Sequence, residues 1–140
     1  MSDWIVINGD VVKFDQSFGN RTVIAPPTTI SGTGKATINK KKVCVLGDEK
    51  QVMIENVPYT TPSNSIPGSG VLTILALDTS QQAQKTLCGQ PVILLGEKFK
   101  AQFVPTLPAL MPPPASTPDP AIPSTGTGSF QASQQRVKAQ

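Results

Sequence analysis

Over its first 104 positions the chain alternates short apolar runs with turn-forming residues. Each run has the length of a strand and ends at Gly, Pro, Asn or Asp, which predicts β-strands separated by turns. The runs are Trp4–Ile7, Val11–Phe14, Thr22–Ile24, Ala36–Ile38, Val43–Leu46, Val52–Ile54, Val71–Leu77, Val92–Leu95 and Phe99–Phe103. The nearest approach to a helical pattern is residues 75–87, where Asp78 is placed to cap a short helix. We therefore expect an all-β fold.

The pattern changes near residues 103–105. The segment 105–140 holds eight of the fourteen prolines and only three charged residues, Asp119, Arg136 and Lys138. Proline removes backbone donors and favours extended conformations, so this segment is not expected to build a packed core. The sequence predicts two parts, a β domain over residues 1–104 and an extended Pro-rich tail over residues 105–140.

One short unit recurs within the β domain. Residues 37–48 align with residues 86–97 without a gap, and a weaker copy covers residues 6–14. The copies share an apolar residue, a turn, and an apolar strand centred on Val12, Val43 or Val92. A single hairpin is marginally stable in water, so the units must pack on one another to bury their apolar faces. Three such units predict a small, conical, pseudo-threefold domain.

Turn-forming residues delimit each unit. Asn8-Gly9 suits the positive φ angles of a hairpin turn, and Asn39 and Gly89 are expected to supply the same geometry in the other copies. The turn and repeat positions are Asn8, Gly9, Asn39, Gly47, Asp48, Gly89, Pro91, Gly96 and Glu97, and the core strand positions are Val12, Val43, Val45, Val92 and Leu94. Short β-turn-β patterns also recur by chance in Gly-rich proteins. The unequal spacing of the copies, 31 and then 49 residues, leaves that alternative open.

Composition narrows the possible functions. The net charge is +3 and no dense Lys/Arg stripe is present, so the pattern does not favour nucleic acid as a partner. No stretch approaches the roughly 20 apolar residues that span a bilayer. The first residues lack the basic region and apolar run of a secretory signal. The basic run Lys40-Lys41-Lys42 fits either a solvated turn or a contact with lipid headgroups or an acidic protein face.

The chemistry of the side chains argues against an enzyme. The chain has no His, which removes Ser-His-Asp and Cys-His catalysis and the usual general base. Cys44 and Cys88 are the sole candidates for a metal site, but two thiolates leave a tetrahedral zinc site two ligands short. Asp48 and Glu97 hold equivalent repeat positions, which threefold geometry would keep too far apart for acid-base work. We expect two buried thiols, no metal and no catalytic residues.

The second and third copies carry a family resemblance. Residues 87–97 read Leu-Cys-Gly-Gln-Pro-Val-Ile-Leu-Leu-Gly-Glu, residues 38–48 run from Ile-Asn to Leu-Gly-Asp, and residues 30–37 provide a Ser-Gly-containing lead-in. Over residues 1–104 the chain resembles the PAAR-repeat family, the spike-tip proteins of contractile injection machines. The resemblance implies a β cap on the blunt end of a trimeric β-helical spike, one tip per trimer. Such a cap sharpens the spike for piercing an envelope.

The departures from the family bear on the site and the setting. Family tips commonly hold zinc with three His and one Cys, and without His we expect no cofactor and apolar packing in its place. The literal Pro-Ala-Ala-Arg tetrad is missing, which favours the diverged branch found in phage tail-like and extracellular particles. The resemblance implies a protein made in the bacterial cytoplasm without a signal peptide and built into such a particle. Transient contact with the target membrane is also implied.

The Pro-rich segment leaves the partners open. Residues 105–140 are expected to contact cargo, an effector or another baseplate component. The alternative function is a small β binding module that recruits a partner or cargo through this tail. Copurification separates the two hypotheses, because a tip binds a trimeric β-helical protein and the module does not.

Overall fold

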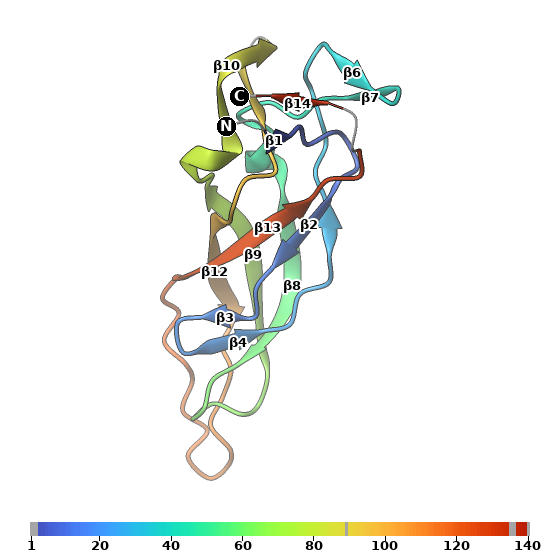
Figure 1. The fold of residues 1–140 in the computed structure, drawn as a ribbon. Coiled ribbons are helices and arrows are strands. Elements are labelled where there is room, and N and C mark those ends of the chain that lie inside the picture. Colours follow the sequence, from blue (N-terminus) through green and yellow to red (C-terminus); the bar gives the residue numbers. More distant parts are fainter. Residues whose placement is uncertain (1–2, 89, 135–136, 140) are drawn as a thin grey trace.

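The computed structural model describes residues 3–88, 90–134 and 137–139, and in this part of the chain the all-β expectation is confirmed (Figure 1). The strands are β1 Asp3–Trp4, β2 Val11–Phe14, β3 Ser17–Phe18, β4 Arg21–Val23, β5 Thr28–Thr29, β6 Thr37–Ile38, β7 Lys41–Lys42, β8 Met53–Thr60, β9 Gly68–Ala76, β10 Gln82–Cys88, β11 Gln90–Ile93, β12 Phe99–Leu107, β13 Ser124–Gln131 and β14 Lys138–Ala139. The helical structure in these residues is limited to two 3₁₀ turns, η1 Asp48–Gln51 and η2 Thr79–Gln81. Asp78 caps η2, since its carboxylate accepts a hydrogen bond from Ser80 N. None of the described helices is long or apolar enough to cross a membrane.

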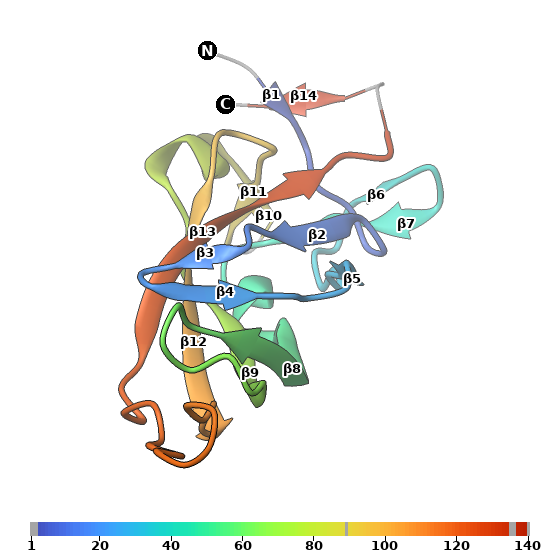
Figure 2. The same cartoon turned by 90° about the horizontal axis from the view of Figure 1, so that it is seen from below.

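An eight-stranded antiparallel sheet forms the body of the molecule. Its strand order is β3-β4-β8-β9-β12-β13-β2-β5. The sheet curls strongly, so that β3 comes back into contact with β13, as Figure 2 shows from below. The concave side encloses the main hydrophobic core, where the ring of Tyr59 meets that of Phe103 at 5.0 Å and Phe99 meets Phe130 at 5.2 Å. The sheet therefore curls around its own core instead of lying flat.

Glycines let the sheet close over its aromatic residues. A Cβ atom added at Gly70 would lie 2.5 Å from the ring of Phe103, and one at Gly128 would lie 2.5 Å from the ring of Phe99. Real Cβ atoms do not approach other atoms so closely, so these two strand positions require glycine.

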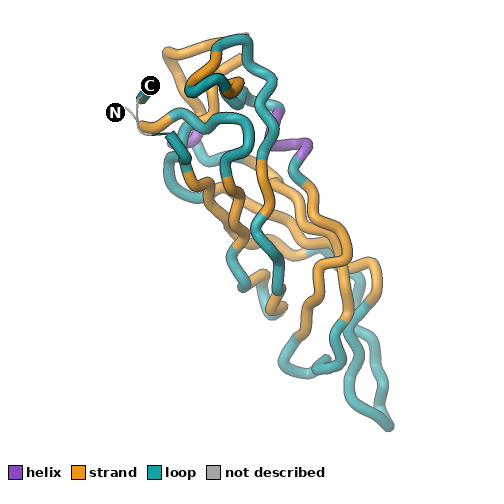
Figure 3. Tube along the Cα trace, turned by 90° about the vertical axis from the view of Figure 1, so that its right-hand side faces the viewer, coloured by secondary structure: helices purple, strands orange, loops and turns teal. Residues whose placement is uncertain are grey.

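Three small ladders occupy one end of the molecule, and loops occupy the other (Figures 1 and 3). The ladders are the antiparallel pairs β1–β14, β6–β7 and β10–β11. The opposite end consists of the β8–β9 loop and the long β12–β13 loop, which lie side by side because Ile66 and Leu110 exchange two backbone hydrogen bonds of 3.0 Å. The two ends differ in architecture, and the threefold pattern is confined to the ladder end.

The structure differs from the expected boundary between residues 104 and 105. Strand β12 runs across that point, and β13 lies inside the central sheet between β12 and β2. Phe130 of β13 is 3% exposed. The physical reason is the distribution of the prolines, which end at Pro123. In the Thr-Gly-Thr-Gly-Ser-Phe sequence of residues 125–130, Thr and Ser alternate with Gly126, Gly128 and Phe130, which suits a strand with one crowded face. Within the described residues 105–134 and 137–139, the Pro-rich segment is thus part of the folded molecule rather than a separate tail.

Candidate functional site

A ring of three backbone hydrogen bonds lies at the ladder end. Val6 N donates to Ile93 O, Ile93 N donates to Cys44 O, and Cys44 N donates to Val6 O, each at 2.9 Å. Every member of the ring donates once and accepts once. Three segments that are far apart in the sequence therefore meet around one axis in the same way.

A second set of three backbone hydrogen bonds links the same arms two residues away from the ring, and its donors and acceptors follow one another around the axis in the opposite direction. Asn8 N donates to Lys42 O at 2.7 Å, Leu46 N donates to Pro91 O at 2.8 Å, and Leu95 N donates to Trp4 O at 2.8 Å. Isolated β-bridges join Ile7 to Val43, Val45 to Val92 and Leu94 to Ile5 in the same cyclic order. Residues 3–10, 41–48 and 90–97 are thus three equivalent arms. Together with their partner strands β14, β6 and β10, we call them the three-armed platform.

The arms bury apolar side chains in two places. The three ring residues belong to the main core. The residues on either side of them in the sequence form a second cluster with one residue from each partner strand. This cluster contains Ile5, Ile7, Ile38, Val43, Val45, Ala83, Val92, Leu94 and Ala139. All nine are at most 9% exposed. The platform therefore has its own core and is joined to the body through the ring.

Each arm ends in a glycine with a positive φ angle followed by an acid. The φ angles are 88° at Gly9, 109° at Gly47 and 53° at Gly96. L residues with side chains rarely adopt such angles, so glycine is required at the same point of each arm. The turn that follows redirects the chain out of the platform and into the body.

In two of the arms the acid holds the turn together. Asp10 Oδ2 accepts from Ile7 N and Asp48 Oδ2 accepts from Val45 N, both at 2.9 Å. Each carboxylate also binds a neighbouring hydroxyl: Ser133 Oγ donates to Asp10, and Thr33 Oγ1 donates to Asp48 at 2.6 Å. Asp10 is 1% exposed and Asp48 is 5% exposed. These carboxylates are structural acceptors for buried N–H groups.

The third arm uses a different device. Its acid, Glu97, is exposed, and Leu94 N donates instead to the backbone oxygen of Gln81 at 2.9 Å. The buried Gln81 side chain then donates to the carbonyls of Leu95 and Glu97 at 3.3 and 3.2 Å. The three arms are equivalent in backbone but not in side-chain support.

The outer strands of the arms have different origins. In the second arm β6 and β7 form a hairpin whose turn has positive φ at Asn39 and Lys40, 54° and 66°. In the third arm β10 precedes β11. In the first arm β1 pairs with β14 from the other end of the sequence, and Lys138 Nζ lies 4.5 Å from the centre of the Trp4 ring. Residues 137–139 therefore supply the strand that a hairpin supplies elsewhere.

The repeat register predicted from the sequence is found for two of the copies. Val43 and Val92, Val45 and Leu94, Gly47 and Gly96, and Asp48 and Glu97 occupy equivalent places. Pro91 lies in β11, where its carbonyl accepts one of the cyclic bonds. Gly89 lies outside the described residues.

The register of the first copy is corrected by the structure. Ile5, not Val12, is equivalent to Val43 and Val92, and Asn8 matches Leu46 rather than Asn39. Val12 is fully buried, but in β2 of the central sheet opposite Phe130. The reason is that the first arm takes its outer strand from β14, so no hairpin turn precedes it in the sequence.

Sequence reasoning also missed several platform residues. Ile5, Ile7 and Ala139 belong to its core, and Gln134 Nε2 donates to Ile5 O at 3.0 Å. One signal was available for the first arm: a glycine followed by an acid at 9–10, 47–48 and 96–97 marks the end of each arm.

Cys44 is fully buried in the main core. Burial raises the pKa of the Cys44 thiol far above its ordinary range, and the negative charges of Asp48 and Asp10 add to this shift. The side chain of Cys88 lies outside what the structure describes. Among the described residues no group of three or more His, Cys, Asp or Glu side chains is arranged to hold a metal ion. Cys44 acts as a small apolar residue of the core.

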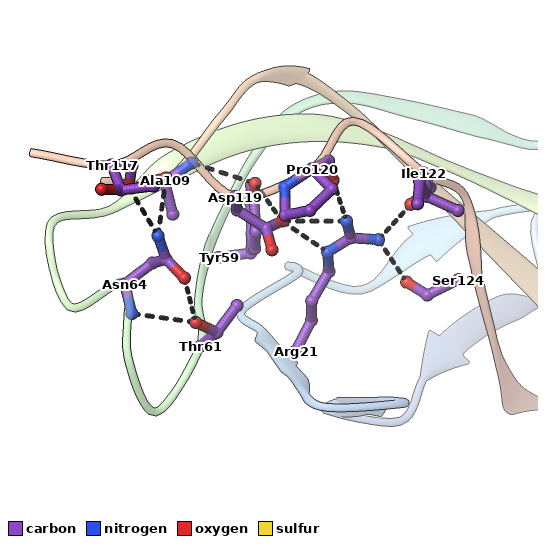
Figure 4. Close-up of polar contacts among 10 residues, drawn as sticks. All are labelled: Arg21, Tyr59, Thr61, Asn64, Ala109, Thr117, Asp119, Pro120, Ile122 and Ser124. Atoms are coloured by element: carbon purple, nitrogen blue, oxygen red, sulfur yellow. Dashed lines mark hydrogen bonds and ion pairs between the residues drawn. The ribbon is translucent and has the colours of Figure 1, made fainter. Parts of the chain in front are cut away.

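A buried polar network anchors the loops at the opposite end (Figure 4). Arg21 and Asp119 form an ion pair at 2.8 Å and are 5% and 6% exposed. The Arg21 guanidinium also donates to the carbonyls of Pro120 and Ile122 and to Ser124 Oγ. The β12–β13 loop is therefore held to β4 through one side chain.

Tyr59 and Asn64 complete this network. Tyr59 Oη donates to Asp119 Oδ2 and accepts from Ala109 N, both at 2.9 Å. Burial and the neighbouring Asp119 raise the pKa of Tyr59, so the hydroxyl keeps the proton that it donates. Asn64 Nδ2 donates to the carbonyls of Ala109 and Thr117, which ties the β8–β9 loop to the β12–β13 loop.

Comparison with models of known protein families identifies a match that covers the chain. The family model described as contractile injection system spike tip protein matches residues 1–140. The search of curated proteins found no match.

Proposed function

Because the chain belongs to the family of contractile injection system spike tip proteins, we propose that it caps the end of a trimeric, β-helical central spike with one tip per trimer. The cyclic bonding of Val6, Cys44 and Ile93 is the observation that carries this proposal. A trimer presents three identical surfaces around its axis, so one chain can match all three only if it repeats a unit three times. The platform contains three such units, its three arms.

The platform also offers three strand edges. Each ladder is two-stranded, so in the described residues β6, β10 and β14 each pair on one side. An open edge accepts a strand from a partner through backbone hydrogen bonds, which tolerate differences in side-chain sequence. Pairing through backbone hydrogen bonds suits the three arms, because they share a backbone geometry and differ in their side chains. Each arm would meet one subunit of the spike.

The role is mechanical rather than enzymatic. The acids of the first two arms are occupied in holding turns, and the ring is made of backbone groups. With the platform on the spike, the loop end points forward, and the elongated body in Figure 3 extends the spike along its axis. Such a tip would lead the spike through an envelope as part of a phage tail-like or extracellular particle.

The alternative of a binding module with a recruiting tail finds less support. Strands β12 and β13 place residues 99–107 and 124–131 in the body, and β14 places residues 138–139 in the platform. What remains for cargo or another baseplate component is the exposed loop between β12 and β13.

Coexpression with the trimeric spike protein of the same injection system tests the proposal. Native mass spectrometry of the purified complex should show one copy of this chain per spike trimer, because three arms of one molecule use all three subunits. Three copies per trimer, or no complex, would contradict capping. A Leu107→Lys variant, changed at a site 63% exposed at the end of the molecule opposite the platform, serves as the control that binds normally.

A further inference from the structure

The end of the molecule opposite the platform carries almost no charge. We define the distal end as residues 61–67 and 105–123. The stretches 56–72 and 104–134, which contain it, hold a single charged residue, Asp119, although 15% of the chain is charged. Asp119 is buried and paired with Arg21. The exposed surface of the distal end is therefore uncharged.

The exposed side chains there include large apolar ones. Leu107 is 63% exposed, Ile122 is 64% exposed and Ile66 is 38% exposed. Exposed prolines accompany them at positions 62, 67, 112, 113, 114, 118, 120 and 123. Large apolar side chains that are exposed at one end of a molecule favour contact with another apolar phase.

The backbone of the distal end is also poor in free donors. Eight of the nineteen residues from 105 to 123 are prolines, which have no N–H group. Of the other eleven, at least six donate to a protein oxygen: Ala109, Leu110, Met111, Ser116, Asp119 and Ile122. Unsatisfied N–H and C=O groups both make an irregular loop costly to place in lipid, and proline removes the N–H group from this cost. Proline and internal bonding both lower that cost.

The buried network removes further polar groups from the surface. Arg21 satisfies the carbonyls of Pro120 and Ile122, and Asn64 satisfies those of Ala109 and Thr117. Both donors are themselves buried. The distal end thus carries its charges and many of its polar groups inside, as a segment entering a medium of low dielectric constant needs to do.

We propose that the distal end is a lipid-contacting surface that enters the acyl–headgroup boundary of a phospholipid bilayer without electrostatic attraction. The inference rests on the proposed function, in which the platform faces the spike and this end leads. The lysines of the β6–β7 hairpin lie at the other end of the molecule and would bind lipid by electrostatic attraction. Contact through the uncharged distal end would not depend on such attraction. The partner is the apolar part of the bilayer, so zwitterionic lipid suffices.

Partition of the full chain into phosphatidylcholine vesicles, measured by flotation at low and high salt, tests the proposal. The test variant is Leu107→Lys/Ile122→Lys, which places two charges on exposed distal positions. The control is Met53→Lys/Leu75→Lys, changed at positions 55% and 50% exposed at the platform ends of β8 and β9. Both variants gain the same charge, and urea unfolding checks that each is folded.

The expected result is salt-independent partition of the unmodified chain, a loss of about ten-fold or more in the distal variant, and no loss in the control. Equal partition of the two variants, or no partition of the unmodified chain, would overturn the proposal. Binding only to vesicles with anionic lipid, abolished by salt, would overturn it too and point to the lysine hairpin. Spike binding by the distal variant is measured separately, so failure on lipid is distinguishable from failure of the capping function.

Discussion

Single carboxylates decide how firmly the arms of the platform are held. Asp10 and Asp48 are buried acceptors for backbone N–H groups of their own turns, whereas the equivalent Glu97 is exposed. Removing a buried acceptor leaves its donors unsatisfied, and that penalty exceeds the net value of the bond itself. The acids at equivalent positions of the three arms are therefore expected to contribute differently to the free energy of unfolding.

Asp48→Ala is expected to lower the free energy of unfolding by about 1–3 kcal/mol, because Val45 N and Thr33 N lose their acceptor. Glu97→Ala, the matched change in the third arm, is expected to leave stability nearly unchanged. Urea titration followed by far-ultraviolet circular dichroism measures both. Equal losses in the two variants would show that the arms are supported alike.

The Arg21–Asp119 pair makes a second residue-scale prediction. Truncating Arg21 to Ala leaves the Asp119 carboxylate buried without its cation, which typically costs about 3–5 kcal/mol. The double variant Arg21→Ala/Asp119→Leu removes the orphaned charge and should be more stable than the single variant. Thermal unfolding compares them. If the double variant is no better than Arg21→Ala, the pair is not the source of the loss.

At the scale of elements, β14 decides whether the first arm is complete. It pairs with β1 over two residues, and Ala139 fills part of the platform core. The second arm has a tight hairpin instead, so its outer strand is held by the chain itself.

Deleting residues 137–140 is expected to expose the first arm while leaving the central sheet folded. Amide hydrogen exchange should speed up over residues 3–10 and stay slow in β9 and β12. Spike binding should fall, because one of three edges is lost. Unchanged exchange at residues 3–10 would contradict a structural role for β14.

The elements that repeat locally were predictable from the sequence, and those paired over long range were not. The hairpin-like copies at residues 37–48 and 86–97 are contiguous, so their register could be read directly. The first arm pairs with β14 from the far end of the sequence, which no local pattern shows. The proline content of residues 105–140 suggested a tail, but the prolines gather in one loop, and Ser124–Gln131 is a central strand whose glycines fit against aromatic rings.

At the scale of the whole molecule, the path of the chain explains why the platform and the distal end differ. Each excursion of the chain between arms adds strands to the central sheet: β2–β5 after the first, β8 and β9 after the second, and β12 and β13 after the third. Excursions of unequal length are absorbed there, which leaves the platform threefold. The loops that end the longest strands form the uncharged distal end.

A cryo-electron microscopy reconstruction of the tip on its spike trimer, refined without imposed symmetry, tests the central claim most directly. We predict that the platform faces the spike and that β6, β10 and β14 each contact a different subunit. A complex in which the distal loops face the spike, or in which only one subunit is contacted, would contradict capping by the three-armed platform.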